Sequence, residues 1–455
     1  MFHCTFIIDL HLSHPEEGTS MRTLQNQIQS LLLFTIFLLS VTSHANAGVP
    51  LEGQIIVDPD NPRWLKYQGG GPFFLAGPGD PEGFLYRGSR NADGTRDGDQ
   101  FDLINKLKGT GANSIYLMAV RSHGGDGDAT QNPFIENDDR QNINQAVLDQ
   151  WDTWFTEMDK NGIVIYFFFY DDDSKIWSGD AVSDAERNFL ETLVNRFEHH
   201  KHLIWVVAEE YAEEYSPTRI SNIAEVIRNA DDHDHVIAVH KNSGLNFDEF
   251  ADDPNIDQFA IQYNQPDADV LHEGMKTAWQ NAEGKYNLNM SEAGQYGSGK
   301  TARLKNWAIA MGGAYVMILF MDIESTATSD LRDLGHLSEF MESTDFNNMA
   351  PHDEHALSDT KYVLANPGDS YIAYTPNYST GMGLKGMEAG EYTFKWFDPQ
   401  SGNTLLVENV LVEAGDRTWA RPAEMTGDEL ALYLKRAASV DLEPPSPPTG
   451  LRIEQ

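Results

Sequence analysis

The sequence predicts an α/β protein in which a (β/α)8 TIM barrel is followed by a small C-terminal antiparallel β-sandwich. Two observations lead to this fold. Between residues 73 and 345, eight short apolar segments alternate with amphipathic helical segments. After residue 355 the pattern changes to short alternating strands separated by Gly, Asn and Asp turns, without a convincing helix.

The eight predicted barrel strands are short, mostly apolar and bounded by turn residues, as buried parallel strands are. They are Phe73–Gly77, Ser114–Val120, Ile163–Phe169, Leu203–Ala208, Val236–His240, Phe259–Tyr263, Tyr286–Ser291 and Ala314–Leu319. A doubly wound sheet is the alternative, but no G-x-G-x-x-G motif follows any of these strands.

Seven segments between and after these strands carry helical periodicity, and several close with Gly, a common helix C-terminal signal. They are 101–111, 144–162, 184–200, 216–232, 271–284, 300–313 and 330–343. Residues 54–77, which run into the first strand, contain short apolar runs around a polar turn. We expect this segment to form a hairpin that closes the bottom of the barrel.

The first 47 residues have the features of an export signal that follows an upstream extension. From Met21 the chain has a basic start with Arg22 and then an apolar stretch, 31–43, that is too short to span a bilayer. Small residues at Ala45 and Ala47 form a cleavage site. We therefore expect a secreted or periplasmic protein that begins near Gly48; a buried core helix is the alternative interpretation of the apolar stretch.

Four regions follow from these patterns: an extension and signal peptide over 1–47, the barrel with its N-terminal hairpin over 48–350, the β-sandwich over 355–437, and a tail over 438–455. The tail is rich in Pro, which is typical of a linker. Its last residues, "PPTGLRIEQ", resemble the first strand of a fibronectin type III-like module that the sequence does not complete.

The net charge of −38 argues against binding to nucleic acid or to an anionic membrane surface. Loss of residues 1–47 would remove three acidic residues and one basic residue and leave −36. It would also remove Cys4, the only cysteine, so the mature chain could use neither a disulfide nor a thiolate. We expect no cofactor.

Two glutamate positions fall where a barrel enzyme places its chemistry, at the C-terminal ends of strands. The fourth strand runs directly into "AEEY", which places Glu209 and Glu210 at that face, and the seventh strand runs into Glu292. Glycoside hydrolysis needs two carboxyl groups, one to protonate the leaving oxygen and one to attack or to activate water. Glu213 and Glu214 come later in the same loop, and we expect them to be solvated.

Several motifs in order resemble the apiosidase-like glycosidase family of clan A, across about residues 50–437. These are "GGPFFLAG" at the first strand, "IWVVAEE" at the fourth, "VHKNSG" at the fifth, "LNMSEAGQYG" at the seventh and "ARLKNWAIAMGGAYV" into the eighth. "YVLANPGDSYIAYTP" and "YTFKWFDPQSG" resemble the collagen-binding-type β-sandwich that follows the barrel in that family.

The resemblance implies a role for each glutamate. In clan A retaining enzymes the fourth strand carries the acid/base and the seventh the nucleophile, which implies these roles for Glu210 and Glu292. The family's fourth-strand motif reads I-W-x-x-G-G-D or close to L-G-E-E-N, so this chain departs from the Gly-Gly-Asp form. Because of this departure, the resemblance does not fix the substrate, and it leaves open whether Glu209 or Glu210 is the acid/base. The resemblance to clan A also implies that Tyr263, at the end of the sixth strand, lies beside the nucleophile.

Other polar and aromatic residues near predicted strand ends are candidates for contacting sugar, although each could equally have a structural role. The candidate substrate-binding residues are Glu209, Tyr263, His240, Arg121, His123, Trp177, Tyr211 and Tyr296. Asp80 and Asp171 lie on the same rim. The loop from Asp93 has calcium-like spacing but places Ile104 where a bidentate Glu belongs, so we expect no metal.

The sequence thus predicts a secreted glycoside hydrolase that cleaves a plant or algal polysaccharide or oligosaccharide by a retaining mechanism with two glutamates. One alternative is a non-catalytic glycan-binding or adhesion protein built on a degenerate barrel. Another is an inverting glycosidase. A carbohydrate is the expected partner in every case.

Overall fold

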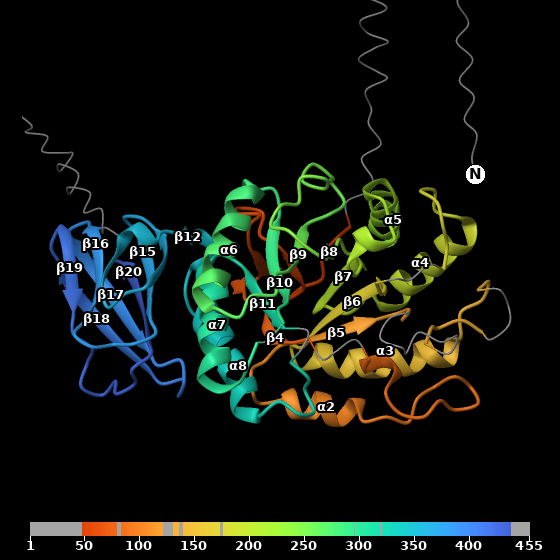
Figure 1. Cartoon of the computed structure of the whole chain (residues 1–455), viewed down its shortest axis with the longest axis horizontal. Helices are drawn as coiled ribbons and strands as arrows, with labels where there is room; N and C mark the ends of the chain where they lie inside the picture. Colours follow the sequence, from red (N-terminus) through yellow and green to blue (C-terminus); the bar gives the residue numbers. More distant parts are fainter. Residues whose placement is uncertain are drawn as a thin grey trace, which may run out of the picture. The chain divides into compact units, whose positions relative to one another are not determined.

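The chain alternates strands and helices up to residue 342 and then continues as strands (Figure 1). The structure is a computed structural model that describes residues 48–79, 83–121, 131–135, 140–172, 176–294, 296–318 and 321–437. The predicted signal peptide, the Pro-rich tail, Asp80 and His123 lie outside these residues. Among the described helices, none combines the length and the apolar character needed to cross a bilayer.

Eight strands form one parallel sheet in the order β4-β11-β10-β9-β8-β7-β6-β5, which confirms the predicted barrel. The strands are β4 (Ala76–Pro78), β5 (Ser114–Met118), β6 (Val164–Tyr170), β7 (Leu203–Ala208), β8 (Val236–Lys241), β9 (Gln258–Gln262), β10 (Asn287–Glu292) and β11 (Tyr315–Ile318). Nearly every residue in them is buried, because helices cover the outer face and side chains fill the interior.

The barrel closes between β4 and β5 through hydrogen bonds outside the regular ladder. The main-chain N–H of Asn113 donates to Ala76 O at 3.0 Å, and that of Tyr116 donates to Gly79 O at 2.7 Å. A Cβ on Gly77 would lie 2.3 Å from Ser114 Oγ. Glycine at position 77 therefore lets the two strands approach closely.

The outer layer consists of seven described helices that follow the predicted segments closely. They are α2 (Gln100–Leu107), α3 (Gln145–Lys160), α4 (Asp184–Phe197), α5 (Pro217–Ala230), α6 (Ala268–Ala282), α7 (Gly299–Met311) and α8 (Thr328–Glu342). Side chains of Asn144, Ser183, Ser216 and Asp267 cap α3, α4, α5 and α6 by accepting main-chain N–H bonds, which fixes where each helix begins.

The first predicted strand is divided between two sheets. β1 (Ile55–Val57), β2 (Leu65–Tyr67) and β3 (Pro72–Phe73) form an antiparallel sheet, and only β4 belongs to the barrel. The chain changes sheets at Phe74 and Leu75, where Phe74 N–H donates to Glu342 Oε1 at 3.0 Å. An apolar run alone could not predict this division, since both halves are buried.

The C-terminal strands form two antiparallel sheets that pack on a common core, which confirms the β-sandwich. One sheet has the order β12-β14-β15-β20-β17-β18 and the other β13-β16-β19. The strands are β12 (Ala350–Pro351), β13 (Ala356–Ser358), β14 (Tyr362–Asn366), β15 (Ser370–Thr375), β16 (Met382–Met387), β17 (Gly390–Phe397), β18 (Thr404–Val412), β19 (Gly415–Trp419) and β20 (Leu430–Arg436).

The sandwich packs directly on helices of the barrel. The ring of Trp307 on α7 stacks on Tyr374 of β15 at 4.8 Å between centroids. Arg303, also on α7, is buried and pairs with Glu429 and with Asp333 of α8, each at 2.9 Å. Both apolar stacking and a buried ion-pair network therefore join the two parts.

Candidate active site

Glu209 and Glu210 directly follow β7, all six residues of which are buried. Glu209 is buried and accepts a 2.6 Å hydrogen bond from the hydroxyl of Tyr116 in the barrel interior. Glu210 is half-buried and has φ +37° and ψ +43°, the left-handed conformation that side chains other than Gly, Asn and Asp rarely adopt. The main chain therefore turns sharply at Glu210 and separates the directions of two adjacent carboxyl groups.

Glu292 ends β10 and is 5% exposed. The pairing of β10 with β9 shifts by one residue between Met290 and Glu292, so that Glu292 lies opposite Gln262. The side-chain Nε2 of Gln262 donates to Glu292 Oε1 at 2.6 Å. A short N–H bond of this kind stabilises the ionised carboxylate.

The same amide also hydrogen-bonds the side chain of Glu210, so Gln262 contacts both glutamates. The pKa of Glu210 rises to about 7, first because the group is buried, and then because of the negative charge of Glu292 and the hydrogen bond and charge of Glu213. The bond from Gln262 opposes this rise. Glu210 can therefore hold a proton near neutral pH, as a general acid must.

Glu213 is exposed, as we expected, but it also contacts Glu210. Its side chain hydrogen-bonds Glu210, and its Oε1 also accepts a 3.3 Å bond from Asn242 Nδ2 in the loop after β8. The third carboxylate of the "AEEYAEE" run is therefore part of the surroundings of Glu210.

His240 lies near the end of β8 and is fully buried. Its Nδ1 accepts a 3.1 Å hydrogen bond from the main-chain N–H of Glu210, and its Nε2 lies 3.8 Å from Glu292 Oε2. Burial lowers the pKa of His240 to about 3, so the ring is neutral. The structure therefore brings His240 to the two glutamates as a fully buried ring.

Tyr263 is placed differently from our expectation. Its ring covers Gly274 on α6, where an added Cβ would lie 2.4 Å from Tyr263 Cε1. Its main-chain N–H donates to the carbonyl oxygen of Glu292 at 3.0 Å. The one-residue shift between β9 and β10 explains the difference, because it brings Gln262 in place of Tyr263 to the side chain of Glu292.

The remaining aromatic candidates are partly occupied by protein contacts. Tyr211 donates to Glu249 at 2.5 Å and packs on Phe250. Trp177 packs in an aromatic cluster with Phe134, Tyr170 and Phe189.

Tyr296 is 5% exposed and lines a hollow of about 520 Å³ formed by the loops after β10 and β11. Arg121 is also buried, and its Nε lies 3.5 Å from Asp171 Oδ2. Asp171 follows β6 as Arg121 follows β5, so this ion pair lies at the same end of the barrel as the glutamates.

Some of these groups are close enough to form a cation site. One ligand atom each from Glu209, His240 and Glu292 lie within 4.8 Å of one another. In the neutral ring, however, Nδ1 accepts the bond from Glu210, so the proton is on Nε2, which then cannot bind a metal. In the predicted calcium-like loop, Asp93 instead accepts bonds from Thr95, including one of 2.6 Å from its hydroxyl.

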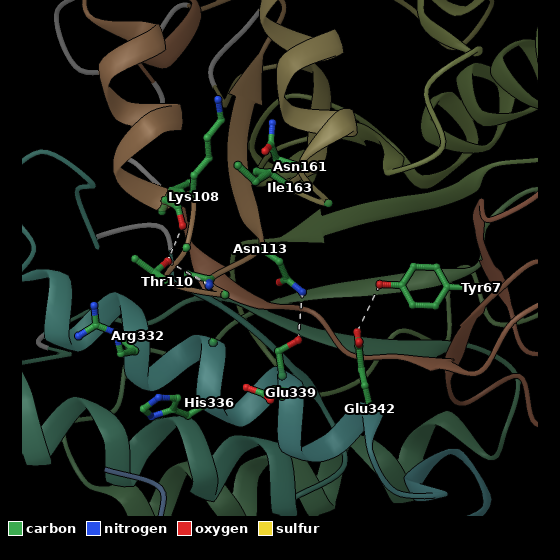
Figure 2. A pocket seen from close by; sticks show the side chains of 17 residues that line it. Tyr67, Lys108, Thr110, Asn113, Asn161, Ile163, Arg332, His336, Glu339 and Glu342 are labelled. Atoms are coloured by element: carbon green, nitrogen blue, oxygen red, sulfur yellow. Dashed lines mark hydrogen bonds between the residues drawn. The ribbon is translucent and has the colours of Figure 1, made fainter. Parts of the chain in front are cut away.

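A separate hollow of about 520 Å³ lies at the opposite end of the strands (Figure 2). Its lining includes Asn113 and Ile163, which directly precede β5 and β6. Figure 2 shows the hydroxyl of Tyr67 pointing to Glu342 on α8. The hydroxyl donates to Glu342 Oε1 at 3.4 Å. Because barrel enzymes react at the other end of the strands, we attribute these contacts to stability.

The barrel holds two acidic side chains at the C-terminal ends of its fourth and seventh strands, which is where barrel enzymes react and is the pair of groups that glycoside hydrolysis needs. The comparison with known families agrees. The chain belongs to the family described as "Apiosidase-like, catalytic domain", whose sequence pattern matches residues 59–294. The protein is therefore a glycosidase, and its substrate is a carbohydrate.

Solved structures agree with the fold. A glycoside hydrolase family 5 protein from Bacteroides vulgatus has a TM-score of 0.60 at 13% identity, with 86% of this chain and 94% of that chain covered. Another structure, named simply a glycoside hydrolase, has a TM-score of 0.59 at 14% identity, with 86% and 99% covered. No curated protein sequence matches the chain.

Proposed function

We propose that the protein is a retaining glycoside hydrolase in which Glu292 is the nucleophile and Glu210 is the general acid/base. The observation that carries the proposal is the unequal environment of the two carboxyl groups. Glu292 accepts a 2.6 Å bond from Gln262, whereas burial and neighbouring charge raise the pKa of Glu210 to about 7. Two carboxyl groups whose environments favour opposite protonation states are suited to act as nucleophile and acid.

The reaction would have two steps. Glu210 gives its proton to the glycosidic oxygen while Glu292 attacks the anomeric carbon, so the leaving group departs as an alcohol and a glycosyl ester forms. The ester removes the negative charge of Glu292, and the pKa of Glu210 falls because that charge was one cause of its rise. Glu210 then takes a proton from the water that hydrolyses the ester and regenerates Glu292.

The substrate we propose is a plant or algal polysaccharide or oligosaccharide. Tyr296, which lines the hollow after β10, is four residues after Glu292 in the sequence. This hollow can receive part of a sugar chain. Arg121 and Trp177 lie at the same end of the barrel, and we keep them, with His123, as candidate substrate contacts. A screen of such polysaccharides for released reducing ends tests this choice.

The mechanism is tested with two variants and one product analysis. Glu292→Ala should abolish turnover on every substrate. Glu210→Ala should lose most activity on substrates with poor leaving groups and less on activated aryl glycosides, and azide should restore part of the loss. Proton NMR of the first-formed sugar should show a retained anomeric configuration.

An inverted product or an active Glu292→Ala enzyme would contradict the mechanism. If Glu209→Ala, and not Glu210→Ala, shows the leaving-group dependence, then Glu209 is the acid/base. We also propose that the protein is exported and begins at Gly48, which mass spectrometry of the exported protein can test.

A further inference from the structure

His240 connects the main chain of one glutamate with the side chain of the other. Its Nδ1 accepts the N–H of Glu210 at 3.1 Å, and its Nε2 lies 3.8 Å from Glu292 Oε2. The ring is fully buried, and Nε2 makes no hydrogen bond within the part of the chain that the structure describes. A buried donor is normally satisfied, so a partner for Nε2 is needed.

The protonation state of the ring follows from these contacts. Nδ1 accepts a bond and therefore presents a lone pair, which leaves the single proton of a neutral imidazole on Nε2. Nε2 lies 3.8 Å from Oε2 of Glu292, whose other carboxylate oxygen accepts the amide of Gln262. Catalytic hydrogen bonds are often long before substrate binds and shorten in the reactive complex, so a 3.8 Å separation can close into a bond.

We propose that His240 is a positioning residue that serves both glutamates: Nδ1 holds the left-handed main chain of Glu210, and Nε2–H stabilises the ionised carboxylate of Glu292. This inference rests on the proposed function, because it assumes that Glu292 must be ionised to attack. It replaces our sequence-based expectation that His240 contacts sugar hydroxyls.

The left-handed turn at Glu210 shows why such a residue is needed. A non-Gly residue held in a sparsely populated conformation is strained and persists only where its surroundings fix it. The bond to Nδ1 is a side-chain contact to the strained residue's own N–H. The imidazole of His240 would therefore hold the main chain of Glu210 in place and also favour the ionised form of Glu292.

The groups that face Glu292 come from three neighbouring strands. His240 approaches from β8, Gln262 from β9, and Glu210 and Glu209 from the end of β7. The charged Lys241 points elsewhere, since its Nζ bonds Glu249 at 2.5 Å. Of the described groups that these contacts identify, the amide of Gln262 and the neutral ring of His240 are the ones that bring an N–H close to the carboxylate of Glu292.

Two variants separate the two contacts. His240→Asn places an amide oxygen near the position of Nδ1 but has no group that reaches Glu292. His240→Gln places an amide N–H near the position of Nε2 but has no acceptor near Glu210 N–H. The measurement is kcat/KM against pH on an activated aryl glycoside that the wild type hydrolyses.

For His240→Asn we expect the acidic limb of the profile to move to higher pH by about one unit, with kcat/KM about tenfold lower on that limb, as for loss of one bond to a charged group. For His240→Gln we expect the acidic limb to stay near that of the wild type, while kcat falls because Glu210 is displaced. His235→Asn is the matched control: His235 is fully buried just before β8 but bonds Asp231 and His200 O, so the limb should not move.

The proposal is overturned if the acidic limbs of His240→Asn and wild type coincide, or if both His240 variants move the limb equally. It is also overturned if EDTA abolishes activity and Zn²⁺ restores it, because an Nε2 that binds metal carries no proton. Activity in Glu292→Ala would instead refute the proposed function, whatever the His240 variants do. If His240→Asn does not fold, a shifted acidic limb in His240→Gln by itself contradicts the proposal.

Discussion

Replacement of Gln262 by Met tests the electrostatic arrangement of the site most directly. Met has a similar length but cannot donate a hydrogen bond, so both contacts of the Gln262 amide are lost with little change in volume. The bond to Glu292 is 2.6 Å and charge-assisted. Bonds to charged groups contribute about 1.5–3 kcal/mol, which corresponds to about one to two pH units in the protonation of the acceptor.

Both limbs of the pH profile of Gln262→Met should therefore move to higher pH. The acidic limb moves by about one to two units because Glu292 becomes easier to protonate. The basic limb moves in the same direction because Gln262 lowers the pKa of Glu210, and its removal raises that pKa above about 7. On the acidic side of the wild-type optimum, kcat/KM should fall about 10- to 100-fold.

The assay is kcat/KM from pH 4 to pH 10 for wild type, Gln262→Met and Tyr263→Phe. Tyr263 is the matched control, because it is the adjacent residue and its ring packs on Gly274 of α6. A Gln262→Met profile that superimposes on the wild type, or one that moves to lower pH, would refute the reasoning. An equal shift in Tyr263→Phe would show that the effect is not specific to the amide.

Three further predictions concern stability. Arg303→Met should lower the free energy of unfolding in urea by about 3–5 kcal/mol, because it leaves Glu429 buried without its cation; an unchanged midpoint would contradict this. Gly77→Ala should lower it by about 1–3 kcal/mol, since the new methyl group meets Ser114 at the barrel seam; calorimetry can measure the lower Tm. Burial raises the pKa of Glu342 to about 7, so the stability from its neutral form is complete below about pH 4.5 and is lost as pH rises through 7. Glu342→Gln should therefore be more stable than wild type by about 1–3 kcal/mol at pH 8 and no more stable at pH 4; equal gains at both values would be inconsistent with this cause.

Much of the barrel could be predicted from the sequence because each strand is short, apolar and followed by a helix. The structure begins β7 and ends it at the predicted residues, and it places Glu210 and Glu292 at the same end of the sheet. The family match supports the predicted class of enzyme. The sandwich could also be predicted, from its short strands and its Gly, Asn and Asp turns. Its first paired strand, β12, however, begins at Ala350 and not after residue 355.

The finer details of the site could not be predicted, because they depend on register and on main-chain conformation. A one-residue shift between β9 and β10 exchanges Tyr263 for Gln262 beside Glu292, and an apolar pattern carries no signal for such a shift. The position of Gln262 near the end of the predicted strand was the only sign in the sequence that it could contact Glu292. The turn at Glu210 is similarly invisible, because glutamate is not a residue that indicates a left-handed conformation.

The left-handed conformation of Glu210 also means that the residue we propose as the acid/base opposes folding. Gly, Asn or Asp would adopt φ +37° at less cost, so random mutagenesis selected for thermal stability alone should accumulate such replacements at position 210 and yield robust but inactive proteins. Directed evolution of this enzyme for heat tolerance therefore needs an activity screen in every round. The same substitutions would suit crystallography of complexes with intact substrate, since they combine loss of turnover with higher thermal stability.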